Sequence, residues 1–201
     1  VADDEDYITF VDSDDYIHSN YARRMIFLCE DNSCNLSQCS YEKGSSDIFE
    51  KTNVDANVEC KTAEEALLGY RIKSQACAKV FKVKVFKDIL FPVGVINEDE
   101  FTTYRAVYSA EKMAFTDENL YYYFQHGTGI MADIAKNLKD NARRYDFLKA
   151  YDERIKFFEE KNLPLQVMKT KEKICTDIIL RYCEQMWLKK EERDTDCVNG
   201  T

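Results

Sequence analysis

Apolar residues in the first half of the chain fall into short runs that polar stretches separate, a pattern typical of strands alternating with helices. Residues 7–11 form a β-rich apolar run that ends abruptly at Asp12, which predicts a buried strand followed by a loop. Residues 20–30 place apolar side chains on one helical face, which predicts an amphipathic helix. Residues 80–86 alternate between Lys and apolar side chains, which predicts a half-buried strand.

Weaker signals predict further elements, and the polar stretch at residues 31–57 otherwise indicates loop. These elements are a strand at residues 36–41, a short helix after Thr62, a helix that opens at Glu98 and a strand at residues 120–124. The helix after Thr62 is indicated by the Glu three residues later, because this spacing forms a capping box.

The pattern changes near residue 130. Gly becomes rare, and long runs of periodic charged and apolar residues at 132–161 and 165–190 predict amphipathic helices. The sequence therefore predicts an α/β domain with a mixed sheet at residues 1–130, followed by an all-helical extension at residues 131–201.

The composition, with 45% hydrophobic and 32% charged residues, is that of an ordinary globular protein. A net charge of −9, with no block rich in Lys or Arg to offset it, argues against a nucleic-acid partner. No apolar stretch approaches the roughly 20 residues of a transmembrane helix, and the first residues do not resemble a signal peptide. A cytoplasmic protein without a membrane anchor is expected.

The eight Cys residues contain no C-x-x-C pair, and only two His residues are present to complete a zinc site. The even spacing of Cys29, Cys34 and Cys39 is a faint metal signal. Free, mostly buried thiols in a reducing compartment are the preferred interpretation.

The acids at positions 12, 14 and 15 follow the first predicted strand, where α/β sheets bind ligands. A D-x-D pair there can bind Mg²⁺ or Mn²⁺, although acids after a strand also serve as loop and helix-capping residues. An EF-hand is excluded, because Ile17 and Arg23 stand where that loop needs Gly and Glu. A haloacid-dehalogenase-like phosphatase is disfavoured, because its later Gly-Asp motif is missing.

Two blocks of sequence carry a family resemblance. The first is Tyr-Ile-Thr-Phe-Val-Asp-Ser-Asp-Asp-Tyr-Ile at residues 7–17. The second contains Lys79-Val80-Phe81, Phe91-Pro92, Gly94, Glu98-Asp99-Glu100-Phe101, Tyr104 and Leu120-Tyr121-Tyr122-Tyr123. In this order they resemble the D-x-D region and the later E-D-E-F and L-Y-Y-Y stretch of family 2 glycosyltransferases of the GT-A fold. Together the blocks span residues 7–131, and the resemblance implies a partial GT-A, Rossmann-like mixed sheet.

The resemblance implies a role for each acid that follows the first strand. Asp14 is expected to be the main ligand of Mg²⁺ or Mn²⁺, supported by Asp12. Asp12 and Asp15 are expected to place the nucleoside-diphosphate sugar that serves as donor. The metal ion would stabilise charge on the departing nucleoside diphosphate.

The resemblance further implies that Asp99, with Glu98 beside it, is the general base that deprotonates the acceptor hydroxyl. A sugar hydroxyl is a poor nucleophile, so a carboxylate within hydrogen-bond reach must accept its proton. Without the resemblance, the acids at 98–100 would be a solvated helix N-terminus. His126 is expected to face the diphosphate, although Phe124 and Gly129 depart from the Arg and Ser common in the family.

The implied function is metal-dependent transfer of a sugar to a glycan or lipid-linked acceptor, as in polysaccharide biosynthesis, with inversion at the anomeric carbon. The family's first strand and its basic segment have no counterpart, so the chain is expected to be N-terminally truncated and inactive by itself. The longer protein to which the chain is expected to belong would be at most peripheral to a membrane. The alternative function is that of a non-catalytic assembly module, which would use the helices after residue 131. A homo-oligomer is one such assembly.

Overall fold

The computed structural model describes residues 3–45, 56–69, 72, 74–95, 97–125 and 146–187. The chain divides into two compact units. The first contains Val1–Pro92 and Glu98–His126, and the second contains Val93–Asn97 and Gly127–Thr201.

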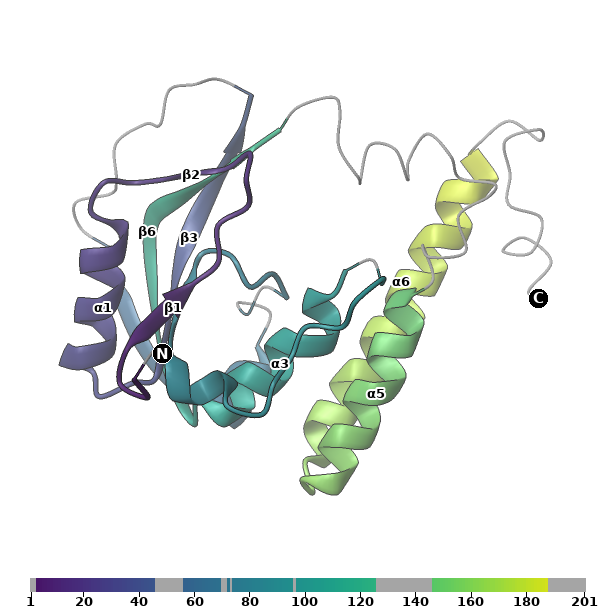
Figure 1. Cartoon of the computed structure of the whole chain (residues 1–201). Coiled ribbons are helices and arrows are strands. Elements are labelled where there is room, and N and C mark those ends of the chain that lie inside the picture. Colours follow the sequence, from purple (N-terminus) through teal and green to yellow (C-terminus); the bar gives the residue numbers. More distant parts are fainter. Residues whose placement is uncertain are drawn as a thin grey trace. The chain divides into compact units, whose positions relative to one another are not determined.

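A six-stranded mixed sheet forms the frame of the first unit (Figure 1). The strands are β1 (Tyr7–Thr9), β2 (Tyr16–Ile17), β3 (Leu36–Gly44), β4 (Val58–Thr62), β5 (Lys79–Lys82) and β6 (Lys112–Phe124). Their order is β1-β5-β3-β6-β2, and β4 also pairs with β6. β3 and β6 run parallel, whereas the other neighbouring strands run antiparallel.

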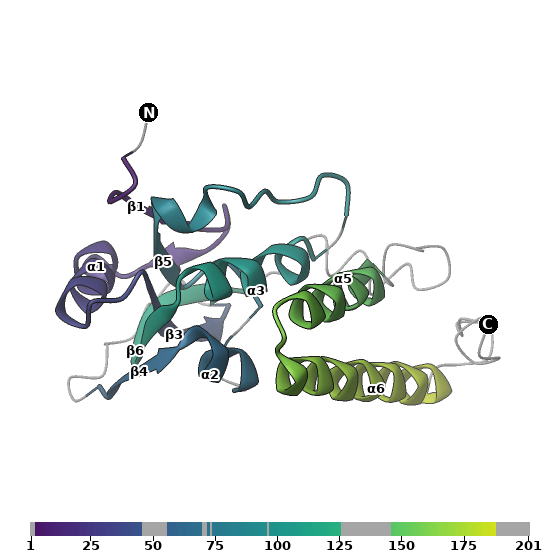
Figure 2. The ribbon, with the colours of Figure 1, turned by 90° about the horizontal axis from the view of Figure 1, so that it is seen from below.

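Helices cover both faces of this sheet, as Figure 2 shows. The helices are α1 (Tyr21–Asp31), α2 (Ala63–Leu68) and α3 (Asp99–Ser109), with a 3₁₀ turn, η1 (Val83–Phe86), after β5. α1 packs on one face, while α2, α3 and η1 pack on the other. Side chains alternate across the sheet, so neighbours such as Val80 and Phe81 enter opposite cores.

Local sequence accounts for the helices α1 and α2. α1 buries Tyr21, Met25, Leu28 and Cys29, the stripe that the apolar spacing predicted. At α2 the Thr62 hydroxyl accepts a hydrogen bond from the backbone of Glu65, while the Glu65 carboxylate accepts one from the backbone of Thr62. The predicted capping box is therefore confirmed.

The long strand β6 links most of the sheet, because it pairs with β3 along one edge and with β4 and β2 along the other. Tyr121 and Tyr122 on this strand are almost fully buried. Tyr122 crosses directly over Gly44 at the end of β3, where a Cβ atom would lie 2.2 Å from the Tyr122 hydroxyl. Gly44 therefore allows the closest packing between the two central strands.

The structure corrects two predictions for the first unit. β1 was predicted as a buried strand, but it is only half-buried, and it pairs antiparallel with β5. It ends the strand order, so among the described residues it pairs along one edge only. Residues 83–86 form a 3₁₀ turn instead of extending β5, and the backbone N–H of Lys87 donates to the carbonyl of Lys84 at 3.4 Å. The signal was ambiguous, because the buried Phe81 and Val85 also match a helical spacing of four.

The second unit contains two helices that lie side by side, α5 (Asp146–Glu160) and α6 (Pro164–Trp187) (Figures 1 and 2). Asn162 adopts a left-handed conformation with φ 56° in the turn between them. The Tyr151 hydroxyl donates a 2.8 Å hydrogen bond to Asp177 on the facing helix. Both helices were predicted, while residues 132–145 and 188–190 of the predicted segments lie outside the described residues.

Two expectations about the whole chain can be compared with the described residues. None of the helices described is long and apolar enough to cross a membrane. The seven described Cys residues are free thiols, four of them buried: Cys29, Cys34, Cys39 and Cys77. This agrees with the interpretation of reduced, mostly buried thiols.

Candidate active site

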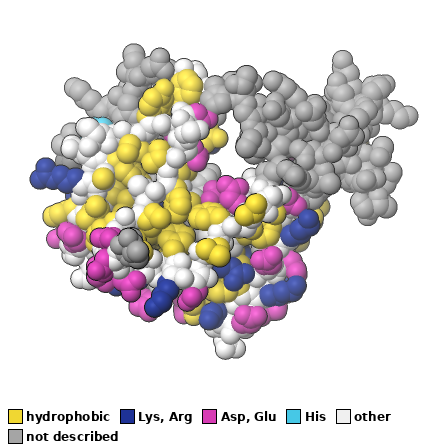
Figure 3. Space-filling model, viewed as in Figure 1, with side chains coloured by type: hydrophobic (Ala, Val, Ile, Leu, Met, Phe, Trp, Pro, Cys, Tyr) yellow, Lys and Arg dark blue, Asp and Glu magenta, His cyan; other side chains and the backbone are white. Residues whose placement is uncertain are grey.

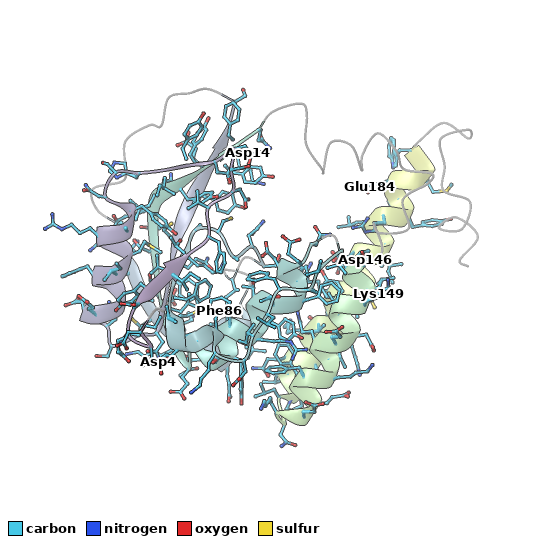
Figure 4. The ribbon with its side chains drawn as sticks, in the orientation of Figure 1. Asp4, Asp14, Phe86, Asp146, Lys149 and Glu184 are labelled. Atoms are coloured by element: carbon cyan, nitrogen blue, oxygen red, sulfur yellow. The ribbon has the colours of Figure 1, made fainter. Side chains whose placement is uncertain are left out.

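The acids that follow β1 lie in a loop, Asp12–Asp15, which is hydrogen-bonded to the end of β6 (Figure 4 labels Asp14). The Tyr121 hydroxyl donates to one carboxylate oxygen of Asp15 at 2.6 Å, and the backbone N–H of Phe124 donates to the other at 2.9 Å. The backbone N–H of Asp12 donates to the Tyr121 hydroxyl at 3.2 Å. The loop itself is a tight turn, in which the N–H of Asp15 donates to the carbonyl of Asp12 at 3.1 Å.

The Asp12 carboxyl experiences concentrated negative charge. Partial burial raises its pKa, and the carboxylates of Asp15, Asp14 and Glu98 raise the pKa further. Glu98 is separated from this loop by more than 80 residues of sequence, yet its charge acts on Asp12. The fold therefore brings the second acidic motif to the loop that follows β1.

Asp99, the first residue of α3, has the more strongly perturbed carboxyl. Burial raises its pKa to about 6, and the negative charges of Glu98 and Asp12 add to this increase. A hydrogen bond from the Ala76 backbone and the positive charge of Lys79 lower the pKa. A carboxyl that titrates near 6 is a stronger base than an exposed aspartate and remains ionised at neutral pH. Such a group can accept a proton from a hydroxyl.

The two acidic segments meet near Cys77. Phe10, two residues before Asp12, forms an isolated parallel bridge with Cys77. Burial raises the pKa of the Cys77 thiol to about 11, and the carboxylates of both Asp12 and Asp99 act in the same direction. The structure thus gathers Asp12, Asp14, Asp15, Glu98 and Asp99 around one region, whereas His126 lies outside the described residues. The roles of these residues remain predictions.

Sequence reasoning gave no role to Lys79 and Tyr121, although both belong to the blocks that carried the resemblance. Lys79 is fully buried, and its ammonium donates to the carbonyl of Gln75 at 2.5 Å. Its charge acts on Asp99. The only signal in the sequence was a Lys at the start of an apolar run. A lysine that is buried at such a position requires polar partners.

The carboxylate oxygens of the loop suit a divalent cation whose remaining coordination positions are filled by a bound substrate. Asp12 and Asp14 are exposed carboxylates on one short loop, and oxygen atoms of this kind are what Mg²⁺ and Mn²⁺ prefer. Among the described residues, no group of three His, Cys, Asp or Glu is arranged to hold a metal ion. Mg²⁺ commonly uses one or two carboxylates together with substrate phosphates, so the loop fits this kind of site.

Aromatic residues flank the acid loop in the sequence, Phe10 before it and Tyr16 after it. Phe10 contacts Phe86 and Phe91 with ring centroids 5.6 and 5.2 Å apart. Beyond the acid loop, the half-exposed ring of Tyr16 contacts Phe124 at 5.8 Å. Figure 3 shows hydrophobic side chains gathered on one face, with Asp and Glu beside them and Lys and Arg toward the periphery of the view. Such surfaces can pack against the apolar faces of sugar rings.

Comparison with solved structures identifies the fold. The chain is similar to S. aureus TarS in complex with UDP-GlcNAc, with a TM-score of 0.55 and 17% identity over 72% of this chain. TarS is a family 2-like glycosyltransferase of the GT-A fold. The chain has part of this fold. A TarS complex with UDP gives a TM-score of 0.50 and 16% identity over 74% of this chain.

The chain spans 40% of the length of the TarS chains in both complexes. No protein-family model matches the sequence, and no curated protein matches it. The partial GT-A fold that the two sequence blocks implied is therefore confirmed as a fold. At this level of identity the likeness does not extend to substrates or to individual residues.

Proposed function

We propose that the full-length protein is a glycosyltransferase that moves a sugar from a nucleoside-diphosphate sugar to an acceptor hydroxyl. The observation that carries the proposal is Asp99, whose pKa is raised to about 6 close to the acid loop at 12–15. The nucleotide-sugar donor is supported by the GT-A fold and by the complexes of TarS with UDP-GlcNAc and UDP.

Asp14, with Asp12 beside it, would hold Mg²⁺ or Mn²⁺ at the diphosphate of the donor. The ion would supply positive charge where the leaving nucleoside diphosphate becomes more negative. The two carboxylates would fix the diphosphate end of the donor near the end of β6. The negative charge that raises the pKa of Asp12 would be relieved by such a cation.

Asp99 would accept the proton of the attacking acceptor hydroxyl. Its partial burial keeps bulk water from competing for the carboxylate, and the Ala76 N–H holds it in place. Attack from the side of Asp99, opposite the leaving diphosphate, would invert the anomeric carbon. The aromatic rings near Phe10 and Tyr16 suit a glycan or the sugar of a lipid-linked acceptor.

Substitution Asp99→Asn in the full-length protein tests this proposal. Transfer from a UDP-sugar should fall by about 100-fold or more, because Asn cannot accept the proton, while donor affinity should stay within about twofold. In the wild type, transfer should fall about tenfold per pH unit below about pH 6, because protonation of Asp99 removes the base.

The matched control is Asp31→Asn, which removes an exposed acid at the end of α1. It should transfer at the wild-type rate. Wild-type turnover by Asp99→Asn, measured with the same donor and acceptor, would refute the role of Asp99 and with it the proposed reaction.

A further inference from the structure

The Tyr121 hydroxyl lies where the acid loop meets β6. It donates to the carboxylate of Asp15 at 2.6 Å and accepts from the backbone N–H of Asp12 at 3.2 Å. One hydroxyl therefore bonds to both the first and the last residue of the Asp12–Asp15 turn. A group in this position can fix the conformation of the residues between them.

The ring that carries this hydroxyl is itself held rigidly. Tyr121 is fully buried, and its ring contacts the buried ring of Tyr21 edge-on with centroids 6.4 Å apart. Its strand pairs with β2 at Ile17 and with β3 at Tyr41. The hydroxyl is consequently anchored to the centre of the sheet, and the loop inherits that position.

Asp15 is less exposed than its two acidic neighbours. Both of its oxygens accept hydrogen bonds from β6, one from Tyr121 and the other from the N–H of Phe124. These bonds turn the Asp15 carboxylate toward the sheet. Asp12 and Asp14, in contrast, are exposed.

From these contacts we infer that Tyr121 is a positioning residue, which together with Asp15 fixes the acid loop so that Asp12 and Asp14 face the donor diphosphate. The inference rests on the proposed function and refines it. Asp15, which sequence reasoning assigned to donor placement, acts through Tyr121 and β6 and not through contact with the donor. Because a displacement of about 1 Å in a catalytic group can lower a rate about 100-fold, the loop's anchorage matters for transfer.

Hydrogen exchange on this chain tests the anchorage. In Tyr121→Phe the backbone N–H of Asp12 loses its acceptor and should exchange roughly tenfold faster, as expected for one lost hydrogen bond. The matched control is Tyr21→Phe, which removes a buried hydroxyl that bonds to Thr9 and to the carbonyl of Lys79 but not to the acid loop. Exchange at Asp12 should be unchanged there. Equal exchange of Asp12 in Tyr121→Phe and wild type would overturn the inference.

Transfer kinetics in the full-length protein test the consequence. With a UDP-sugar and Mn²⁺, Tyr121→Phe should lower kcat roughly 10- to 100-fold and raise the Mn²⁺ concentration needed for half-maximal rate. Tyr21→Phe should change neither quantity, even where it lowers the melting temperature as much. The Mn²⁺ requirement is the quantity that a purely structural role would leave unchanged.

The two possible failures give different results. If the wild type transfers sugar and Tyr121→Phe behaves like Tyr21→Phe, the positioning role is wrong while the proposed function stands. If the wild type transfers no sugar from any nucleoside-diphosphate sugar, the proposed function fails and the positioning role fails with it. Faster exchange at Asp12 would then describe only the structure of the loop.

Discussion

Two acidic segments of similar composition differ in how strongly burial perturbs their carboxyl groups. The carboxylates of Asp12 and Asp14 are exposed on a loop that side-chain and backbone hydrogen bonds attach to β6. Asp99 lies at the start of α3, where burial raises its pKa to about 6. The comparison shows that burial and neighbouring carboxylates raise the pKa of both Asp12 and Asp99, and that Asp99 is the more strongly perturbed of the two.

The position of Asp99 strengthens this contrast. An acid in the first turn of a helix normally gains from the helix dipole, which would lower its pKa. At Asp99, in contrast, burial and the neighbouring carboxylates raise the pKa. Glu98 makes no capping hydrogen bond to the helix either. Within this helix N-terminus Asp99 is thus partly buried, whereas Glu98 before it is exposed.

A large effect on transfer is expected from Asp14 in the exposed acid loop. Asp14→Asn in the full-length protein should lower sugar transfer about 100-fold at saturating donor, because the proposed cation loses its main protein ligand. Asp31→Asn, on the far end of α1, should leave both rate and metal requirement unchanged. A wild-type rate at the same Mn²⁺ concentration would show that the loop does not bind the catalytic ion.

A smaller effect, on stability, is expected at the partly buried Asp99. The folded-state pKa of Asp99 is raised to about 6, above the roughly 3.9 of an unfolded chain, so ionisation costs folded-state stability above pH 6. Asp99→Asn should therefore raise the free energy of unfolding of this chain by about 1–2 kcal/mol at pH 8. The gain should fade as pH falls from 6 and vanish below about pH 4, where the carboxyl is protonated in both states.

Chemical denaturation of this chain at pH 8 and pH 4 measures that effect. Asp31→Asn provides the comparison for loss of an exposed acid. A decrease in stability of Asp99→Asn at pH 8 would show that the surroundings stabilise the carboxylate, which is incompatible with a raised pKa at Asp99.

Elements with a long or strongly periodic pattern could be predicted from the sequence. The stripe that contains Tyr21 and Met25 identified α1, and the capping box at Thr62 identified α2. β2, with two residues, and β4, whose side chains alternate between exposed and half-buried, were missed. Both pair with β6, so partners distant in sequence, and not local propensity, determine them.

The candidate site was predictable to the extent that its acids stand in recognisable motifs. Asp12, Asp14 and Asp99 follow from the two sequence blocks, and the structure gathers them. The part played by Tyr121 could not be predicted, because its hydroxyl reaches Asp15 across 106 positions of sequence. The ring of Tyr121 is buried on the strand that the sequence predicted at residues 120–124, but the sequence does not reveal what its hydroxyl contacts.

The central claim is that the acid loop and Asp99 share one site, and an NMR titration of the Asp99 carboxyl carbon in this chain tests it most directly. The wild-type midpoint should lie at about pH 6. In Asp12→Asn the midpoint should fall, because one repelling carboxylate has been removed. A midpoint near 4 in the wild type, or one that does not respond to Asp12→Asn, would contradict the shared site.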